Sequence, residues 1–211
     1  MMLTMVFLAI GQPRIVKTSV PVSAQSNLDL SFDFADEIKI EYWDKKEVYV
    51  EVSVNINDNQ HNDIFTLTST SSESSVSIAM DKDIWDKIDR PKSDYGCNWT
   101  TELDYTAFLP KGMTVESYTI SGDYNLTYSG SPFELKTISG EIDITVPTSD
   151  HVDFKAKTIS GEIFSDIDIT YPWGKDGLRQ IVGQDVKGRI GKGGESIKME
   201  TISGNIYLRK G

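Results

Sequence analysis

The sequence predicts an all-β protein whose second half is a parallel β-solenoid, a β-helix-like stack of coils with Thr-Ile-Ser-Gly corners, preceded by non-repetitive strands that cap it. Three observations predict this fold. The four-residue motif recurs along residues 111–211, and the residues on either side of each copy alternate between apolar and polar. The composition is also rich in Ile, Val, Thr and aromatic residues, which favour strands.

Length and charge limit the possible functions. The chain has 211 residues, enough for one full-sized domain or two small ones, and a formal net charge of −11. A nucleic acid or an anionic membrane needs a basic face on its partner, so neither is expected as a partner. The single Cys97 cannot form an internal disulfide, so the fold must depend on packing and strand pairing.

Residues 1–24 are expected to form an export signal or a disordered N-terminus. Residues 2–10 are an apolar run that is too short to span a bilayer, as in signal peptides. Cleavage is compatible with the sequence before Gln12 or before Gln25, and an N-terminal strand that stays in the fold is the alternative. No later segment approaches the roughly 20 apolar residues of a transmembrane helix. We therefore expect export to the periplasm, cell surface or medium, with no integral membrane segment.

Residues 25–110 have the pattern of strands but carry no repeat. Clean alternation at 38–42 and 48–54 flanks a polar turn, as in a pair of adjacent strands. Residues 81–98 break the alternation and place apolar residues at helix-like spacing, which predicts a short helix or an ordered loop. This N-terminal region is expected to cap the repeats of 111–211, and the two parts are compatible with one continuous domain.

Each copy of the motif is expected to form a corner between two strands. The alternation before the Ile-Ser-Gly step is out of phase with the alternation after it, and glycine permits the backbone angles of such a corner. A degenerate Lys-Gly-Arg-Ile copy fills the one long gap in the repeat. The predicted corner glycines are Gly122, Gly140, Gly161, Gly188 and Gly204. Stacked coils about 4.8 Å apart would then form one inward column, made of Tyr124, Ile142, Ile163, Ile190 and Ile206.

The strand that ends in Leu109-Pro110-Lys111-Gly112, followed by Thr119-Ile120-Ser121-Gly122-Asp123 and further coils, resembles the bacterial putative-adhesin family. This family comprises β-strand-repeat domains of unknown function related to the head GIN domain. The resemblance covers most of the chain after the N-terminal segment and implies an exported all-β solenoid without assigned catalytic residues. The chain departs from the pattern in an insert at 171–180, and Arg189 stands where the repeat has an acidic residue.

The motif also predicts an acidic ladder, because an acidic residue follows three of the glycines. Asp123, Glu141 and Glu162 would stack along the solenoid, but three carboxylates supply too few oxygens for calcium, so solvated turns are the favoured interpretation. His61 and His151 have no second metal-binding residue at ligand spacing. We therefore expect no metal and no cofactor.

Tyr171 and Trp173, in the insert, are the candidate ligand-contact residues. They could stack on a sugar or pack over the exposed edge of a coil. The function that the sequence favours is a non-catalytic module of the cell envelope, or a secreted one, that binds a glycan or a protein. A β-helix carbohydrate-active enzyme and an envelope-stress accessory protein with a protein partner are the alternatives. The acidic residues recur in register with the repeat, which is typical of structural turns, so no catalytic residue is expected. The ligand and the oligomeric state stay open.

Overall fold

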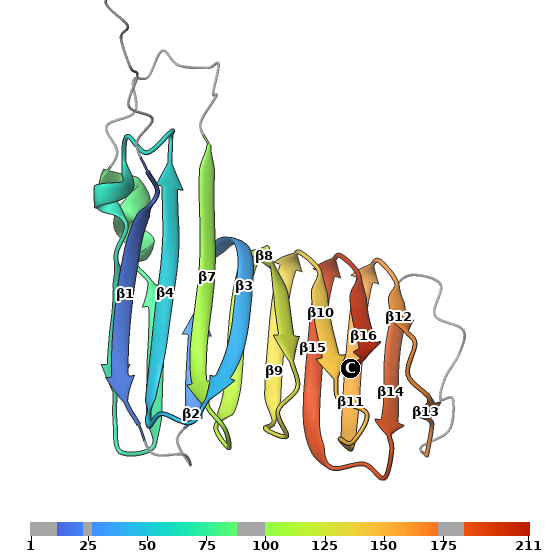
Figure 1. Cartoon of the computed structure of the whole chain (residues 1–211). Helices are drawn as coiled ribbons and strands as arrows, with labels where there is room; N and C mark the ends of the chain where they lie inside the picture. The colour runs from blue at the N-terminus through green and yellow to red at the C-terminus, as the bar shows by residue number, and fades with distance from the viewer. Residues whose placement is uncertain (1–11, 23–26, 88–99, 173–183) are drawn as a thin grey trace, which may run out of the picture.

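The computed structural model describes residues 12–22, 27–87, 100–172 and 184–211 (Figure 1). In these ranges the chain forms one mixed sheet of 16 strands and two short 3-10 helices, η1 (Asn62–Ile64) and η2 (Lys82–Lys87). The protein is therefore all-β, as predicted. The N-terminal strands are β1 (Arg14–Pro21), β2 (Asn27–Ser31), β3 (Phe34–Trp43), β4 (Glu47–Ile56), β5 (Leu67–Ser71), β6 (Ser75–Met80) and β7 (Thr101–Pro110). The others are β8 (Thr114–Thr127), β9 (Phe133–Ser139), β10 (Ile142–Val146), β11 (Val152–Ser160), β12 (Ile163–Ser165), β13 (Ile169–Thr170), β14 (Gln184–Ile190), β15 (Glu195–Ser203) and β16 (Ile206–Lys210).

The sheet is divided into two layers, and the long strand β8 belongs to both. Its first half pairs with β2 and β9, and its second half pairs with β3 and β10. We call the strands in the order β5-β6-β2-β8-β9-β15-β11-β14-β13 the first layer. The second layer runs β1-β4-β7-β3-β8-β10-β16-β12.

Five coils, each a first-layer strand followed by a second-layer strand, are stacked in parallel. Four of them are β2–β3, the two halves of β8, β9–β10 and β11–β12, and the fifth is β15–β16. The fifth coil is last in the chain but not last in space. It lies between β9–β10 and β11–β12, so strands from the C-terminus are paired on both sides (Figure 1).

The finer prediction of a parallel β-solenoid is not confirmed. The sheet is not closed, and antiparallel pairs stand at both ends of the coil array. At one end β4 pairs antiparallel with β1 and β7, and β5 with β6. At the other end β14 pairs antiparallel with β11 and β13. The coils also do not follow one another in chain order, as successive turns of a solenoid would.

The core lies between the two layers and follows the period-two alternation of the strands. Tyr124, Ile142 and Ile206 are buried and lie in register on neighbouring strands, as expected for the inward column. Ile163 continues the register but is only partly buried, because β12 is the outermost described strand of its layer. Including Ile190 in this column was wrong, since it lies on the antiparallel strand β14 opposite Val152 and Ile169.

Part of the predicted export segment is in the sheet. Residues 14–21 form β1, which pairs with β4 along eight residues and buries Val20. Residues 1–11 and 23–26 lie outside the described residues, as do Cys97 and most of the break predicted at 81–98. The start of that break forms η2, with Ile84 buried. In the described ranges, no helix has the length and apolar character needed to cross a bilayer.

Candidate functional site

Four of the five corner glycines form one column at the bend between the layers. Their order in space is Gly122, Gly140, Gly204 and Gly161, which follows the stacking of the coils. A Cβ on Gly140 would overlap the carbonyl oxygen of Gly122, and Cβ atoms on Gly204 and Gly161 would overlap the carbonyls of Gly140 and Gly204. Close backbone approach therefore requires glycine at these corners. Gly188 lies inside β14, where the Phe154 ring occupies the space of a side chain, and it forms no corner.

The threonine of the motif points inward at each corner and lies beside the column of glycines. Thr119, Thr137, Thr158 and Thr201 are all buried. Three of their hydroxyls donate to the glycine carbonyl of the neighbouring coil: Thr137 to Gly122 (3.4 Å), Thr201 to Gly140 (3.1 Å) and Thr158 to Gly204 (2.9 Å). These bonds satisfy backbone acceptors that the corner removes from the strand ladders.

The isoleucine of the motif points outward, and sequence reasoning missed this feature. Ile138, Ile202 and Ile159 are 37%, 43% and 44% exposed, and Ile120 is partly exposed. In stacking order, Ile120, Ile138, Ile202 and Ile159 form a continuous apolar edge that we call the isoleucine ridge. The signal was present in the sequence, because inward alternation through Phe133 and Leu135 continues to the threonine and leaves isoleucine outside.

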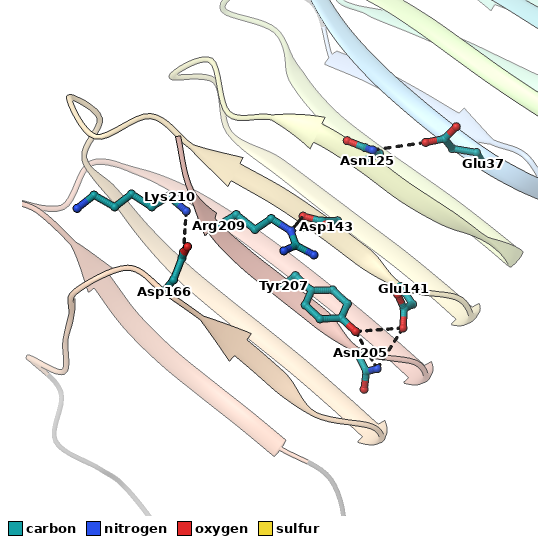
Figure 2. A network of polar contacts seen from close by, with 9 residues as sticks. All are labelled: Glu37, Asn125, Glu141, Asp143, Asp166, Asn205, Tyr207, Arg209 and Lys210. Carbon is teal, nitrogen blue, oxygen red and sulfur yellow. Dashed lines mark hydrogen bonds and ion pairs between the residues drawn. The ribbon is translucent and has the colours of Figure 1, made fainter.

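The acidic ladder is present, but the amide side chain of Asn205 interrupts it. Asn205 of the inserted coil stands between Glu141 and Glu162, so the expected contact between these two carboxylates was wrong. The Asn205 amide nitrogen donates to Glu141 at 3.1 Å (Figure 2). Its amide oxygen accepts from the backbone N–H of Glu162 at 3.0 Å. Asp123 likewise accepts from the backbone N–H of Glu141 at 2.8 Å. The described residues contain no group of three or more side chains suited to a metal ion.

Beside this ladder lies a cluster of aromatic and charged side chains on the outer surface of β10, β16 and β12. We call Asp143, Phe164, Tyr207 and Arg209 the outer platform. The rings of Phe164 and Tyr207 are stacked, with centroids 5.3 Å apart and planes at 12°. The Tyr207 hydroxyl donates to Glu141 at 3.3 Å, which fixes the ring from its far end (Figure 2).

Arg209 links the two sides of the platform. Its Nε donates to the Asp143 carboxylate at 2.7 Å, and its guanidinium carbon is 5.0 Å from the centre of the Tyr207 ring. The hydrogen bond with Asp143 raises the pKa of the Arg209 guanidinium, which is positively charged at neutral pH. Among the described residues, the hydrogen bonds of this side chain come from its Nε alone.

Of the two aromatic residues that the sequence singled out, the one that the structure describes, Tyr171, is not part of this cluster. Tyr171 is 41% exposed and follows β13, on the first layer. Trp173 lies outside the described residues, so a platform made by these two side chains stays a prediction. The outer platform was missed because Phe164 and Tyr207 are distant in the chain and meet only through the insertion of the last coil.

No family model matches the chain, and no curated protein matches it. A solved structure shares its fold. A putative cell adhesion protein from Clostridium sporogenes is 10% identical and superposes with a TM-score of 0.58, over 95% of this chain and 100% of that one. A putative adhesin from Parabacteroides merdae (10% identity, TM-score 0.26) is covered over 69% of its length by 72% of this chain. A putative lipid binding protein from Parabacteroides distasonis (9% identity, TM-score 0.24) is covered over 96% of its length by 93% of this chain. The clostridial protein has the same fold. The two weaker superpositions do not establish a common fold. The resemblance to putative adhesins is thus supported at the level of fold, and the relation to the head GIN domain is not.

Proposed function

We propose that the protein is a non-catalytic binding module, exported and displayed at the cell envelope, which binds a neutral glycan on the outer platform. In this proposal the stacked coils act as a short solenoid-type scaffold that holds the platform rigid. The clostridial protein of the same fold is described as a putative cell adhesion protein, which is consistent with a role in attachment.

The observation that carries the proposal is the exposed aromatic stack. Phe164 is 43% exposed, and Tyr207 covers only one face of its ring. Because β12 is the outermost described strand of the second layer, no strand of the described residues covers the other face. An aromatic face of this kind packs well against the apolar C–H face of a pyranose, and rigid strands fix its position.

Polar groups beside the stack are suited to sugar hydroxyls. Arg209 has terminal N–H donors that form no hydrogen bond to the described residues, and the carboxylate of Asp143 offers acceptor lone pairs in addition to those it uses for Arg209. Acidic side chains predominate around the platform, because Glu141, Asp143 and Asp166 accompany Arg209 and Lys210 (Figure 2). This balance disfavours anionic sugars and favours a neutral glycan.

A glycan-cleaving enzyme is less well supported. Glycoside hydrolysis requires two carboxyl groups that act on one bond, one of which must exchange protons freely. Glu141 already accepts hydrogen bonds from Asn205 and Tyr207, and Asp143 pairs with Arg209. These contacts show that both carboxylates hold neighbouring side chains in place, which disfavours a role as the catalytic acid or base.

The experiment is a glycan array with the full chain, followed by titration of the best neutral oligosaccharide. The F164A/Y207A variant should bind this oligosaccharide at least about tenfold more weakly, because it removes the stacking surface. The Y118A variant is the control, since Tyr118 is an exposed aromatic residue of the first layer. The proposal fails if no neutral glycan binds, or if F164A/Y207A binds as tightly as Y118A. Release of new reducing ends from the array glycans would favour the enzyme.

A further inference from the structure

The isoleucine ridge continues beyond the repeats into an apolar pocket. Phe34, on the neighbouring coil, lies in register with Ser121 and is 39% exposed. It meets Trp85 edge to face, with ring centroids 5.7 Å apart. Four coils therefore present an outward isoleucine each, and the fifth presents Phe34 level with the motif serine, one residue beyond the isoleucine column. The five side chains span about 19 Å at the usual strand separation.

The pocket at this end has a volume of about 320 Å³. Its lining is formed by Phe34, Ala35, Asp36, Trp85, Thr101, Leu103 and Ser121. The indole Nε1 of Trp85 is buried without an acceptor in the described part of the chain. An apolar pocket of this size is suited to one anchoring side chain of a ligand that lies along the ridge.

Charge along the ridge is one-sided. On the second-layer side, the position after each corner carries Glu37, Asp123, Glu141 and Glu162, with Asn205 as the only neutral member of the described coils. No lysine or arginine of the described residues forms an ion pair with these four carboxylates. On the first-layer side the lysines nearest the ridge are already paired, Lys136 with Glu134 at 2.6 Å and Lys157 with Glu200 at 2.8 Å.

We propose that the isoleucine ridge docks a basic amphipathic segment of a partner protein. The apolar side of that segment would pack on the isoleucines, and its Lys or Arg residues would pair with the acidic ladder. A second copy of this chain fits poorly, because an isologous contact would bring two acidic ladders together in proteins of net charge −11. This surface is separate from the outer platform, so the inference does not depend on the proposed glycan.

The test uses the full chain and a synthetic helical peptide of about 13 residues, the length that matches the ridge. One peptide carries leucine at helical spacing with lysine on either side, and a matched peptide carries glutamate in place of lysine. We expect the lysine peptide to bind and to weaken as salt rises, and the glutamate peptide not to bind. The I138S/I202S and E37Q/E162Q variants should each weaken binding at least about tenfold. The glutamine variant removes charge without touching the core, so it remains informative if the serine variant folds poorly.

The control variant is F164A, which removes an outer-platform ring and leaves the Tyr207–Glu141 contact in place, and which should bind the lysine peptide as the parent does. Three results would overturn the proposal. The first is that the lysine peptide does not bind, or that it binds equally to the parent, to I138S/I202S and to E37Q/E162Q. The second is binding to phosphatidylcholine vesicles that I138S/I202S abolishes, which would assign the ridge to a lipid surface. The third is concentration-dependent dimerisation lost in I138S/I202S, which would assign it to a second copy.

Discussion

The hydroxyl of Thr158 donates a 2.9 Å hydrogen bond to the carbonyl oxygen of Gly204, 46 residues further along the chain. The bond joins the coil β11–β12 to the last coil, β15–β16. Thr158 is 1% exposed, so this polar contact is made inside the core. Buried hydroxyls of this kind are retained where they satisfy a backbone acceptor that water cannot reach.

Replacing Thr158 with valine should therefore destabilise the fold although the side-chain shape is kept. The Gly204 carbonyl would lose its partner, at a cost of about 1–3 kcal/mol. Thr127→Val is the control, because Thr127 is exposed at the end of β8. Urea denaturation checks the difference, and similar midpoints for the two variants would contradict this role of the hydroxyl.

A side chain at Gly204 should be more damaging than the loss of the threonine hydroxyl. A Cβ there would overlap the carbonyl oxygen of Gly140, and neither backbone can move without breaking strand pairs. We expect Gly204→Ala to cost about 3 kcal/mol or more. Gly130 has φ +85 but nothing within 4 Å of an added Cβ, so Gly130→Ala should cost only about 1 kcal/mol of backbone strain. Thermal denaturation of both variants measures the contrast, and equal losses would mean that backbone angles rather than the close approach require glycine.

Alanine substitutions at inward and outward residues of β10 should differ sharply in their effect on the free energy of unfolding. Ile142 is fully buried between Tyr124 and Ile206, so Ile142→Ala should cost about 2–5 kcal/mol. Asp143 points outward and pairs with Arg209, whose side chain is 53% exposed, so Asp143→Ala should cost less than about 1 kcal/mol. Ile163→Ala should fall between them, because this residue is partly exposed at the edge. Equal effects at Ile142 and Asp143, measured by urea denaturation, would contradict the register.

The sequence predicted the elements of this fold better than their arrangement. Alternation located the strands, and the motif located the corners at Gly122, Gly140, Gly161 and Gly204, because both are local properties of the chain. The degenerate copy at Gly188 was misleading because a glycine with an isoleucine two residues later also occurs inside an antiparallel strand. No local feature of the sequence distinguishes a strand that pairs parallel with the neighbouring coil from one that pairs antiparallel with it.

The order of the coils could not be predicted for a different physical reason. Each of the four coils with the motif presents the same inward threonine, glycine backbone and apolar residue to its neighbours, so any of these coils can stack on any other. The position of β15–β16 is decided by long-range pairing, which leaves no periodic trace in the sequence. The outer platform depends on that position, because Tyr207 meets Phe164 and Asp143 only when the last coil lies between theirs.

A carboxylate cluster on β7 should make stability depend on pH. Burial, and then the nearby charges of Asp36, Glu37 and Glu102, raise the pKa of Asp104 above its usual value of 3.8. The folded state therefore holds this proton more tightly than the unfolded chain does. Its contribution to stability is greatest at low pH and is lost as pH rises from 3.8 through the folded pKa.

At neutral pH the ionised Asp104 slightly lowers the free energy of unfolding, and the Asp104→Asn substitution should remove this destabilisation. Because Asp104 is largely exposed and its carboxyl group is only partly desolvated, solvent screens the charge, and we expect a gain of no more than about 0.5 kcal/mol. The gain should shrink as the pH is lowered through the folded pKa. Urea denaturation of parent and variant at several pH values, in low salt, provides the measurement. A gain that is the same at all pH values would exclude the titration of Asp104 as its cause.

Removing the last coil tests the coil order most directly. If coils followed the chain order, deletion of residues 195–211 would only shorten the array, as removal of a terminal repeat does. Here β15 and β16 pair on both sides, with β9 and β10 on one and with β11 and β12 on the other. Their loss should therefore leave β11–β14 with no parallel neighbour and should unfold that end of the protein. The matched control is deletion of residues 1–21, which removes β1, a strand paired only with β4. Hydrogen exchange should show lost protection throughout β11 and β14 in the first variant, and loss confined to β4 in the second. Full protection of β11 in the chain that lacks 195–211 would mean that the last coil is not inserted.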